Sequence, residues 1–529
     1  MAERWDGRRE RGRLRLLTWA FGAVFLFFTG LFIRYQLLGA LGEGAFLLPA
    51  FSQRQKAVAV TLARGRILDR HGVPLHYPVW GNALVDLRSS VGDSPVKVKR
   101  SLTATEVEEI LARESGDAAI VPEEIRYGPN SLACHVVGHV RPNAYNDPRD
   151  NVGESGLEKA FQGTLAGGSP AWSGVVVTAE GDGLPGTGMR IAPPAQDPAD
   201  LYTTLDAGVQ RSVEDVLDRN GVSRGAVVVL DALTSEIIAM ASRPEFDQNH
   251  PELSLEAEGS PFVNRALSAF APGSVFKPVI AALALERGYV DPTEVFVCTG
   301  EVTVGDRAIA CGSSKGGHGE VTLSQALAQS CNSALIQIGM RIPAAVMVDF
   351  IKTSGFGVKT GIPLDNEAAG SLPDPWDMYS GDIANLCIGQ GRLSVTPLQV
   401  ATFFASLYSG GVYRRPSLIM ERIKDDGIRV MSAETAEKIT EALVLTTRSG
   451  TGKKAWIPLY GSAGKTGTAE TGRGSGLTHA WFCGVTPVIA PRYVIVVMVE
   501  EGGDGPSVAA PIFREIGQLL LDTHTSAVP

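Results

Sequence analysis

A serine and a lysine three residues apart are the first side chains in this sequence that could do chemistry together. They lie in the segment Phe270-Ala-Pro-Gly-Ser274-Val-Phe-Lys277, whose proline and glycine place the serine in the first turn of a predicted helix. Positions three apart share one face of a helix. A serine hydroxyl is a weak nucleophile until a base takes its proton, and a partly buried lysine with a lowered pKa can be that base. Because the pair alone is a common chance pattern, it needs support from elsewhere in the chain.

Two further motifs supply that support. Ser330-Cys331-Asn332 follows the first motif, and Gly464-Lys465-Thr466-Gly467-Thr468 stands just before an apolar strand predicted at Ala480–Val485. In this order the three motifs resemble those of the penicillin-recognising serine acyltransferases, which are S-x-x-K, S-x-N and K-T-G. A chance serine–lysine pair would not bring the other two motifs with it.

A second K-T-G, formed by Lys359-Thr360-Gly361, lies much closer to Ser330. It stands in a glycine-rich stretch that predicts a turn after a helix, and it lacks the Thr-Ala pair that follows the later copy. We therefore interpret it as structural and take Lys465 as the functional lysine.

Four more segments are similar to class B penicillin-binding proteins, which are monofunctional peptidoglycan D,D-transpeptidases. Two of them lie in the N-terminal part and two in the predicted catalytic domain: Arg64-Gly-Arg-Ile-Leu-Asp69-Arg70-His-Gly72, Gly153-Glu-Ser-Gly156-Leu-Glu158-Lys, Thr204-Leu-Asp206 and Gly389-Gln-Gly-Arg-Leu-Ser-Val-Thr-Pro-Leu-Gln399. The resemblance therefore runs from about residue 60 to residue 515. Ser235 stands where the family usually has glycine, and Glu470 stands where glutamine is frequent.

The resemblance implies a catalytic mechanism. Lys277 takes the proton of Ser274, which attacks the penultimate D-alanine carbonyl of a stem peptide. Backbone N–H groups of Ser274 and Thr468 hold the developing oxyanion, and each such donor contributes about 3–4 kcal/mol. Ser330 and Lys465 relay a proton to the departing D-alanine.

The same resemblance assigns the substrate contacts. Asn332 binds a substrate amide, while Thr466 and Thr468 hold the terminal carboxylate beside Lys465. Gly467 has no side chain, so that the peptide can lie against the edge of this strand. An amine of a neighbouring stem peptide then takes the acyl group. No cofactor is required for these steps, and β-lactams acylate the same serine.

Cys298, Cys311, His318 and Cys331 form a second cluster with the spacing C-x12-C-x6-H-x12-C. Thiolates and imidazole are the ligands that tetrahedral structural zinc prefers. Some elongation-type class B enzymes are similar here, with metal ligands at comparable positions and a cysteine inside the S-x-N motif. The cluster therefore favours an elongation-type enzyme over a division-type one. The alternatives are a disulfide between Cys298 and Cys311, which export permits, or unpaired buried thiols.

The elements that must position these residues suggest two modules. Residues 34–200 have weak periodicity and many turn formers, which predicts an irregular, extended pedestal. Residues 201–529 are predicted to form an α+β transpeptidase domain of the penicillin-binding and serine β-lactamase type, with an antiparallel sheet from both ends of the domain and a helical subdomain between them. We expect strands at Ala226–Leu230, Glu236–Ala241, Ala480–Val485 and Tyr493–Glu500, and helices after Pro272 and over Leu323–Ile338, Leu398–Tyr408 and Pro511–Leu521.

Arginines dominate residues 1–15, and an uncharged run follows at Leu16–Ile33. The run is long enough to cross a bilayer as a helix, and arginines on its front side favour the cytoplasm. We therefore expect a cytoplasmic tail over 1–15, one transmembrane helix over 16–33 and a catalytic domain on the periplasmic side of the inner membrane. A cleaved signal peptide is the alternative, but Arg34, Tyr35 and Gln36 stand where a small-residue cleavage site would follow.

Charge and family resemblance together limit the partners. The net charge of -9 argues against a nucleic-acid surface. The resemblance implies stem peptides and β-lactams as ligands and, because the N-terminal module is too short for a glycan-polymerising domain, a separate SEDS-type glycan polymerase as partner. The rival functions are a membrane-anchored β-lactamase or β-lactam sensor, and a non-catalytic wall-synthesis scaffold. A lactamase rarely needs an anchor with so large a module, and a scaffold has no need of Lys277 or Lys465.

Overall fold

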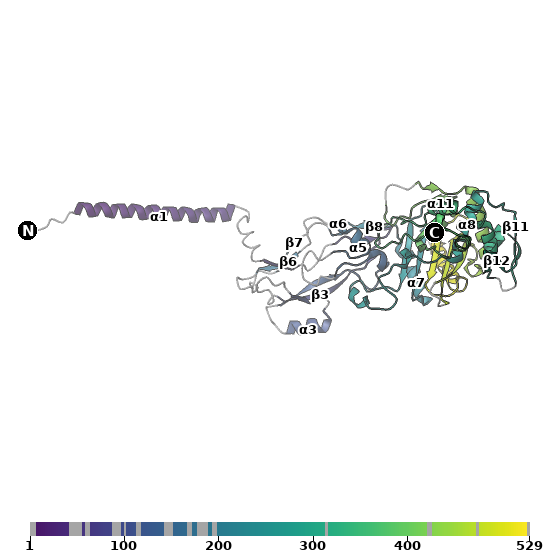
Figure 1. Ribbon diagram of the computed structural model, residues 1–529. Coiled ribbons are helices and arrows are strands. Elements are labelled where there is room, and N and C mark those ends of the chain that lie inside the picture. The colour runs from purple at the N-terminus through teal and green to yellow at the C-terminus, as the bar shows by residue number, and fades with distance from the viewer. Residues whose placement is uncertain are drawn as a thin grey trace, which may run out of the picture.

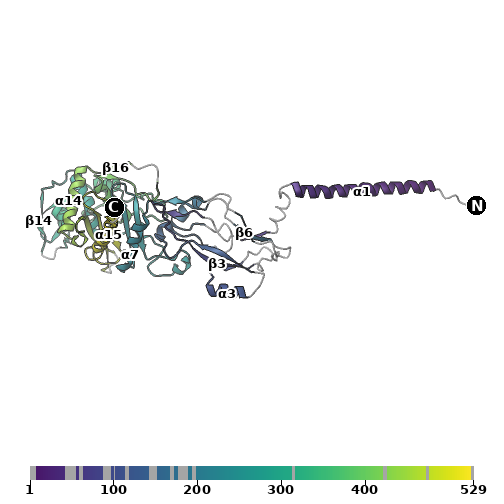
Figure 2. The same cartoon turned by 180° about the vertical axis from the view of Figure 1, so that it is seen from behind.

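A long helix, a slender module and a larger domain follow one another along the molecule (Figure 1, and from behind in Figure 2). The computed structural model describes residues 7–41, 55–58, 64–86, 97–99, 102–112, 118–141, 152–166, 172–176, 189–192, 198–312, 316–420, 426–471 and 476–525. Helix α1 (Gly7–Leu41) projects away from the rest, and its stretch Gly12–Arg34 is long and apolar enough to span a membrane. The helix begins before the predicted span because arginine is a good helix former. Residues 1–6 of the predicted tail lie outside the described residues.

The slender module, which we call the pedestal, is built from short elements, as its weak periodicity predicts. Two three-stranded sheets have the orders β1-β6-β7 and β4-β3-β5. The pedestal elements are β1 (Gln55–Val58), β2 (Ile67–Leu68), β3 (Val79–Asp86), β4 (Lys97–Lys99), α3 (Ala104–Ala112), β5 (Ala118–Ile125), α4 (Cys134–Val137), α5 (Gly156–Ala160), α6 (Gln162–Leu165), β6 (Trp172–Val176) and β7 (Met189–Ala192).

A buried carboxylate joins the two N-terminal segments that resemble class B motifs. Glu158 has no exposed surface, and its two oxygens meet Arg64 at 2.6 Å and Arg126 at 2.5 Å. The Tyr127 hydroxyl donates to the same carboxylate at 3.1 Å. Burial acts to raise the pKa of Glu158, but the two guanidinium groups outweigh it and leave that pKa lowered. The ion pairs therefore hold together segments far apart in the sequence.

The first pedestal motif also connects to the larger domain. Strand β2 pairs in parallel with β8 (Leu201–Tyr202). Asp69 accepts the backbone N–H of Ala207 at 3.0 Å, and Arg70 forms an ion pair with Glu236 at 3.1 Å. These contacts fix the junction between the two modules.

The larger domain is α+β, as predicted, and it is centred on an antiparallel sheet with the order β10-β9-β19-β18-β17. Its strands are β9 (Gly225–Asp231), β10 (Ile237–Arg243), β17 (Ala463–Glu470), β18 (Thr478–Thr486) and β19 (Tyr493–Val499). Both ends of the domain sequence therefore contribute strands to one sheet, as the strand pattern predicts. Strand β17 lies at an edge of this sheet, and no strand among the described residues pairs with its outer side.

Helices cover both faces of this sheet. On β9, Val227 and Val229 pack with α7 (Ala207–Arg219) and α15 (Ala509–Thr525), whereas Val228 and Leu230 pack with α13 (Pro397–Tyr408). This alternation follows from the two-residue period of a strand. The central strands are therefore apolar on both sides and hold the sheet rigidly under the site.

A helical subdomain and several small hairpins fill the sequence between β10 and β17. Its helices are α8 (Lys277–Glu286), α9 (Leu323–Ala328), α10 (Asn332–Gly339), α11 (Ala344–Thr353), α12 (Ser380–Cys387) and α14 (Ala433–Arg448). The hairpin strands are β11 (Val295–Cys298), β12 (Glu301–Val304), β13 (Arg307–Ala310), β14 (Gly319–Thr322), β15 (Val412–Tyr413) and β16 (Ile428–Arg429). Short 3-10 turns complete it at η2 (Pro251–Ser254), η3 (Arg265–Leu267), η4 (Gly273–Phe276), η5 (Pro375–Asp377) and η6 (Lys453–Ala455).

Replacing Glu158 with glutamine should destabilise the pedestal by about 3–5 kcal/mol, because Arg64 and Arg126 would keep buried charges without a carboxylate. Hydrogen exchange of the β2 amides measures this loss locally. Since the folded pKa of Glu158 is lowered, the stabilisation is present above the unfolded pKa and is lost as pH falls through the folded one. Glu515→Gln, which breaks an exposed pair with Arg219, is the control and should cost less than about 1 kcal/mol. Equal effects of the two changes would contradict the assigned role of burial.

Candidate active site

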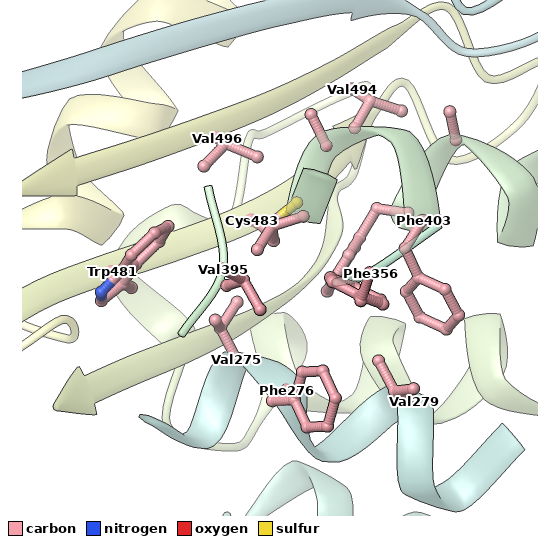
Figure 3. Packing of buried hydrophobic residues seen from close by; sticks show 14 of the residues in the cluster. Val275, Phe276, Val279, Phe356, Val395, Phe403, Trp481, Cys483, Val494 and Val496 are labelled. Carbon is pink, nitrogen blue, oxygen red and sulfur yellow. The ribbon is translucent and has the colours of Figure 1, made fainter. Parts of the chain in front are cut away.

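Ser274 lies in the 3-10 turn η4, directly before helix α8. Val275 and Phe276 after it are buried, while Ser274 itself remains partly exposed. Figure 3 shows both apolar side chains within the packed core, and the ring of Phe276 lies 5.3 Å from that of Phe356 between centroids. The nucleophile therefore stands at the surface end of a segment that the core holds in place.

A close approach of two backbones fixes the turn before the serine. Gly273 donates its N–H to the Gly389 carbonyl at 2.9 Å. A Cβ atom at Gly389 would lie 2.0 Å from the Gly273 carbonyl oxygen, and Gly389 has a φ of 74°. Only glycine fits this position without displacing the turn that carries Ser274. This explains the glycine that opens the Gly389–Gln399 motif.

Lys277 is buried with no exposed surface, and its Nζ is the point where the first two motifs meet. The amine donates to the Ser330 carbonyl at 2.6 Å, to the Ser330 Oγ at 3.2 Å and to the Asn332 Oδ1 at 2.6 Å. Burial lowers the pKa of Lys277 to about 8, against the opposing effect of Cys311 and Cys331. Among the described residues, no hydrogen bond joins Lys277 to the Ser274 hydroxyl.

The S-x-N motif sits in a break between two helices. The prediction of one helix over Leu323–Ile338 is wrong, because α9 ends at Ala328 and α10 begins at Asn332. Ser330 has a φ of 56°, which a right-handed helix does not allow. Cys331 then caps α10 by accepting the Ala334 N–H with its sulfur. The break is what turns the carbonyl and hydroxyl of Ser330 toward Lys277.

The K-T-G motif lies on edge strand β17. Lys465 has no exposed surface, and burial, followed by the nearby charge of Lys277, holds its pKa well below the usual range. Thr466 shares a hydrogen bond of 2.8 Å with Thr451, and Thr468 accepts the backbone N–H of Gly505 at 3.3 Å. Thr451 belongs to none of the predicted motifs, and its flanking Gly450 and Gly452 are the signal in the sequence that could have pointed to it.

Gly467 brings β17 against the serine turn. A Cβ atom there would lie 2.8 Å from the Pro272 carbonyl oxygen and 3.1 Å from the Val275 nitrogen. The absent side chain therefore makes room for the residues on either side of Ser274, which differs from the predicted role of admitting substrate. This contact places the third motif beside the first.

The earlier K-T-G does not join this site. Lys359 is exposed, and the N–H and hydroxyl of Thr360 both donate to Glu367 at 2.6 Å. The N–H of Gly361 donates to the same carboxylate at 3.1 Å. The segment is therefore a turn closed by a buried glutamate, as its glycine-rich surroundings predict.

The predicted cysteine and histidine cluster does come together. The ligand atoms of Cys298, Cys311, His318 and Cys331 all lie within 4.8 Å of one another. The two sulfurs of Cys311 and Cys331 are 3.7 Å apart, and no disulfide joins Cys298 to Cys311. The cluster also touches the S-x-N motif, because the Asn332 N–H donates to the Cys311 sulfur at 3.2 Å.

The geometry as a whole can support acyl transfer. A buried amine that is easily deprotonated lies one helical turn from Ser274. The pKa of a second buried amine, that of Lys465, is lowered by burial and then by the nearby charge of Lys277. The outer edge of β17, which pairs with no strand in the described part of the chain, runs past the serine and can accept an extended peptide as an added strand.

Comparisons with known proteins identify the family of the chain. Residues 225–518 match the penicillin binding protein transpeptidase domain. Penicillin-binding protein PbpB of Mycolicibacterium smegmatis is 32% identical, over 75% of this chain and 65% of that protein's length. Peptidoglycan D,D-transpeptidase MrdA of Acinetobacter baumannii is 28% identical, over 96% of this chain and 88% of that protein.

A solved structure also resembles the chain over almost its whole length. It is described as "Structural coordination of polymerization and crosslinking by a peptidoglycan synthase complex", with a TM-score of 0.72 and 28% identity over 96% of this chain and 97% of that one. The match covers the pedestal as well as the catalytic domain. The family match, these relatives and the joined motifs show that the chain belongs to the class B penicillin-binding proteins.

Proposed function

We propose that the chain is a peptidoglycan D,D-transpeptidase that cross-links stem peptides through an acyl-enzyme on Ser274. The observation that carries this proposal is the environment of Lys277. Its amine is fully buried, has a pKa near 8 and is oriented by Ser330 and Asn332. A lysine in such a place is partly deprotonated near neutral pH and can act as a general base.

Acylation begins when Lys277 takes the proton of the Ser274 hydroxyl. The oxygen then attacks the penultimate D-alanine carbonyl, and the N–H groups of Ser274 and Thr468 hold the oxyanion. The proton passes through Ser330 and Lys465 to the amine of the departing D-alanine, which leaves as the peptide bond breaks. An amine of a second stem peptide attacks the ester and restores the serine. β-Lactams acylate the same oxygen by opening of their ring.

The terminal carboxylate of the donor binds at the start of β17. Thr466 and Thr468 offer hydroxyl groups on one side of the strand, and Lys465 directly precedes Thr466 in sequence. Asn332 has two amide protons, of which one is donated to the Ala310 carbonyl at 2.9 Å. The other proton is available for a substrate carbonyl.

The cysteine and histidine cluster fits a structural zinc ion. Tetrahedral zinc with bonds of about 2.3 Å to sulfur and about 2.0 Å to nitrogen separates two sulfurs by about 3.8 Å and sulfur from nitrogen by about 3.5 Å. The Cys311–Cys331 separation is 3.7 Å, and the His318 Nδ1 lies 3.5 Å from the sulfur of Cys298 and 3.4 Å from that of Cys311. Zinc would bind the thiolates and imidazole and so fix the loop that orients Ser330 and Asn332.

The cellular setting follows from the anchor and the family. Helix α1 fits a single-pass anchor that holds the catalytic domain on the periplasmic side of the inner membrane. The similar structure from a peptidoglycan synthase complex supports a partnership with a separate glycan polymerase of the SEDS type. The cysteine and histidine cluster supports a role in elongation.

Labelling of the purified chain with a fluorescent penicillin tests the catalytic assignment. Ser274→Ala should abolish labelling, and Lys277→Ala and Lys465→Ala should each slow it by about 100-fold or more. Lys359→Ala changes the lysine of the other K-T-G and should label like wild type. Labelling that survives the loss of Ser274 would refute the assigned nucleophile.

The pH dependence of acylation tests the base. Because the unprotonated form of Lys277 increases up to its pKa near 8, the acylation rate constant should rise about tenfold per unit at lower pH and level off above about 8. Rapid-quench measurements with benzylpenicillin between pH 6 and 10 give this profile. A rate that stays constant over that range would contradict a lysine base of lowered pKa.

Metal analysis of freshly purified protein tests the zinc site. Wild type should hold about one zinc ion per chain, and Cys331→Ser should lose most of it, since a ligand is removed. Cys387→Ser changes a buried cysteine that does not belong to the cluster and should retain the metal. Wild type without zinc, or with a Cys298–Cys311 disulfide by mass spectrometry, would end the metal assignment.

A further inference from the structure

Two aromatic side chains stand in front of helix α12 with most of their surface exposed. Trp376 lies in η5 and is 89% exposed, and Tyr379, the residue before α12, is 77% exposed. Within the part of the chain that the structure describes, neither the indole N–H nor the phenol hydroxyl makes a hydrogen bond. Tryptophan and tyrosine are the residues that contribute most to many recognition surfaces, so this pair is a candidate binding surface.

The turn that carries the two rings is itself held firmly. The Trp376 backbone N–H donates to the Asp374 carboxylate at 3.0 Å. Arg392 donates to the carboxylate of Asp377 at 2.8 Å and to its carbonyl oxygen at 2.5 Å. The backbone is therefore fixed while the rings have no partner of their own. A ligand that covers the rings would not have to order a loop first, which lowers the entropic cost of binding.

Helix α12 connects this turn to the catalytic serine. The helix ends at Cys387, just before Gly389, and Gly389 accepts the N–H of Gly273 next to Ser274 at 2.9 Å. One end of α12 therefore lies at the aromatic turn and the other end at the serine turn. Its eight residues span about 12 Å.

The substrate of the proposed reaction has a sugar at a matching distance from its reacting carbonyl. A stem peptide is joined to its glycan strand through its first residue, and three residues separate the penultimate D-alanine from the sugar. Three extended residues span about 10 Å. A stem peptide that runs along α12 from Ser274 would therefore bring its sugar to Trp376 and Tyr379.

The chemistry of the aromatic turn favours a neutral sugar chain over an anionic partner. The faces of an N-acetylhexosamine present C–H groups that can pack on an aromatic ring. Its hydroxyl and acetamido groups can bond the indole N–H and the phenol hydroxyl. Asp374 and Asp377 are exposed on the same turn and would repel a phosphate-bearing lipid or polymer. They do not repel an uncharged sugar.

We propose that Trp376 and Tyr379 form a platform that binds the glycan strand from which the reacting stem peptide projects. This inference rests on the proposed transpeptidase function and deepens it, because it assigns a place to the sugar part of the substrate. The two rings take no part in the bond changes at Ser274. They hold the strand while its peptide reaches the serine, so their binding depends on the sugar and not on the peptide.

A neutral hexasaccharide of β-1,4-linked N-acetylglucosamine, labelled with fluorescein, is the probe, because it has the sugar rings without a peptide. Fluorescence anisotropy with the full-length chain in detergent measures its Kd. Trp376→Ala and Tyr379→Ala should each raise the Kd by about tenfold, because each change removes one packed ring. Trp376→Phe retains a ring and should raise the Kd less than Trp376→Ala does.

Trp80→Ala is the matched control, because Trp80 is a tryptophan that is 68% exposed on strand β3 of the pedestal. It should leave the Kd unchanged. If wild type does not bind the hexasaccharide, or if the Trp376 and Tyr379 variants bind it as wild type does, the platform is overturned and the rings are left to a protein partner. Penicillin labelling of wild-type Ser274 would still uphold the transpeptidase in that case. A wild type that penicillin fails to label would instead overturn the proposed function, and with it the role of the sugar as part of a substrate.

Discussion

The proposed active site depends on the burial of one amine. Lys277 is inside the domain, and its Nζ contacts a carbonyl, a hydroxyl and an amide oxygen, with no carboxylate paired to it among the described residues. Dipoles of this kind orient an ammonium group but do not offset the free energy that it loses on leaving water. The pKa of Lys277 therefore falls. A single carboxylate at this place would favour the charged form and remove the base. The break between α9 and α10 supplies uncharged partners instead.

In the pedestal, a buried charge is paired with opposite charges. Glu158 is as deeply buried as Lys277, but it meets two guanidinium groups and keeps its charge. Paired charges of this kind hold segments in register and are unsuited to proton transfer. The same chain therefore combines burial with neutral partners at Lys277, where we propose that a proton moves, and burial with opposite charges at Glu158, where two segments must stay together.

Strand β17 connects catalysis to recognition. Its inner face is packed against the serine turn through Gly467, while its outer edge pairs with none of the strands that the structure describes. An edge of this kind is normally a hazard for aggregation, and here it is the surface on which a peptide can lie. Along this edge Thr468 and Glu470 are exposed, whereas Ala469 between them is buried.

The sequence by itself determined the family and the sheet and predicted the chemistry, because motif residues and two-residue alternation are local properties of the chain. It also named the cluster around Cys331, since its ligand types are visible without coordinates. Only the tertiary structure decided how Ser330 faces Lys277, because a left-handed residue that splits one apolar helical pattern into two helices leaves no mark in hydrophobic periodicity. The role of Gly467 could not be predicted from the sequence either. Its missing side chain leaves room for the backbone of Pro272 and Val275, which is almost 200 residues away in sequence and is brought there only by folding.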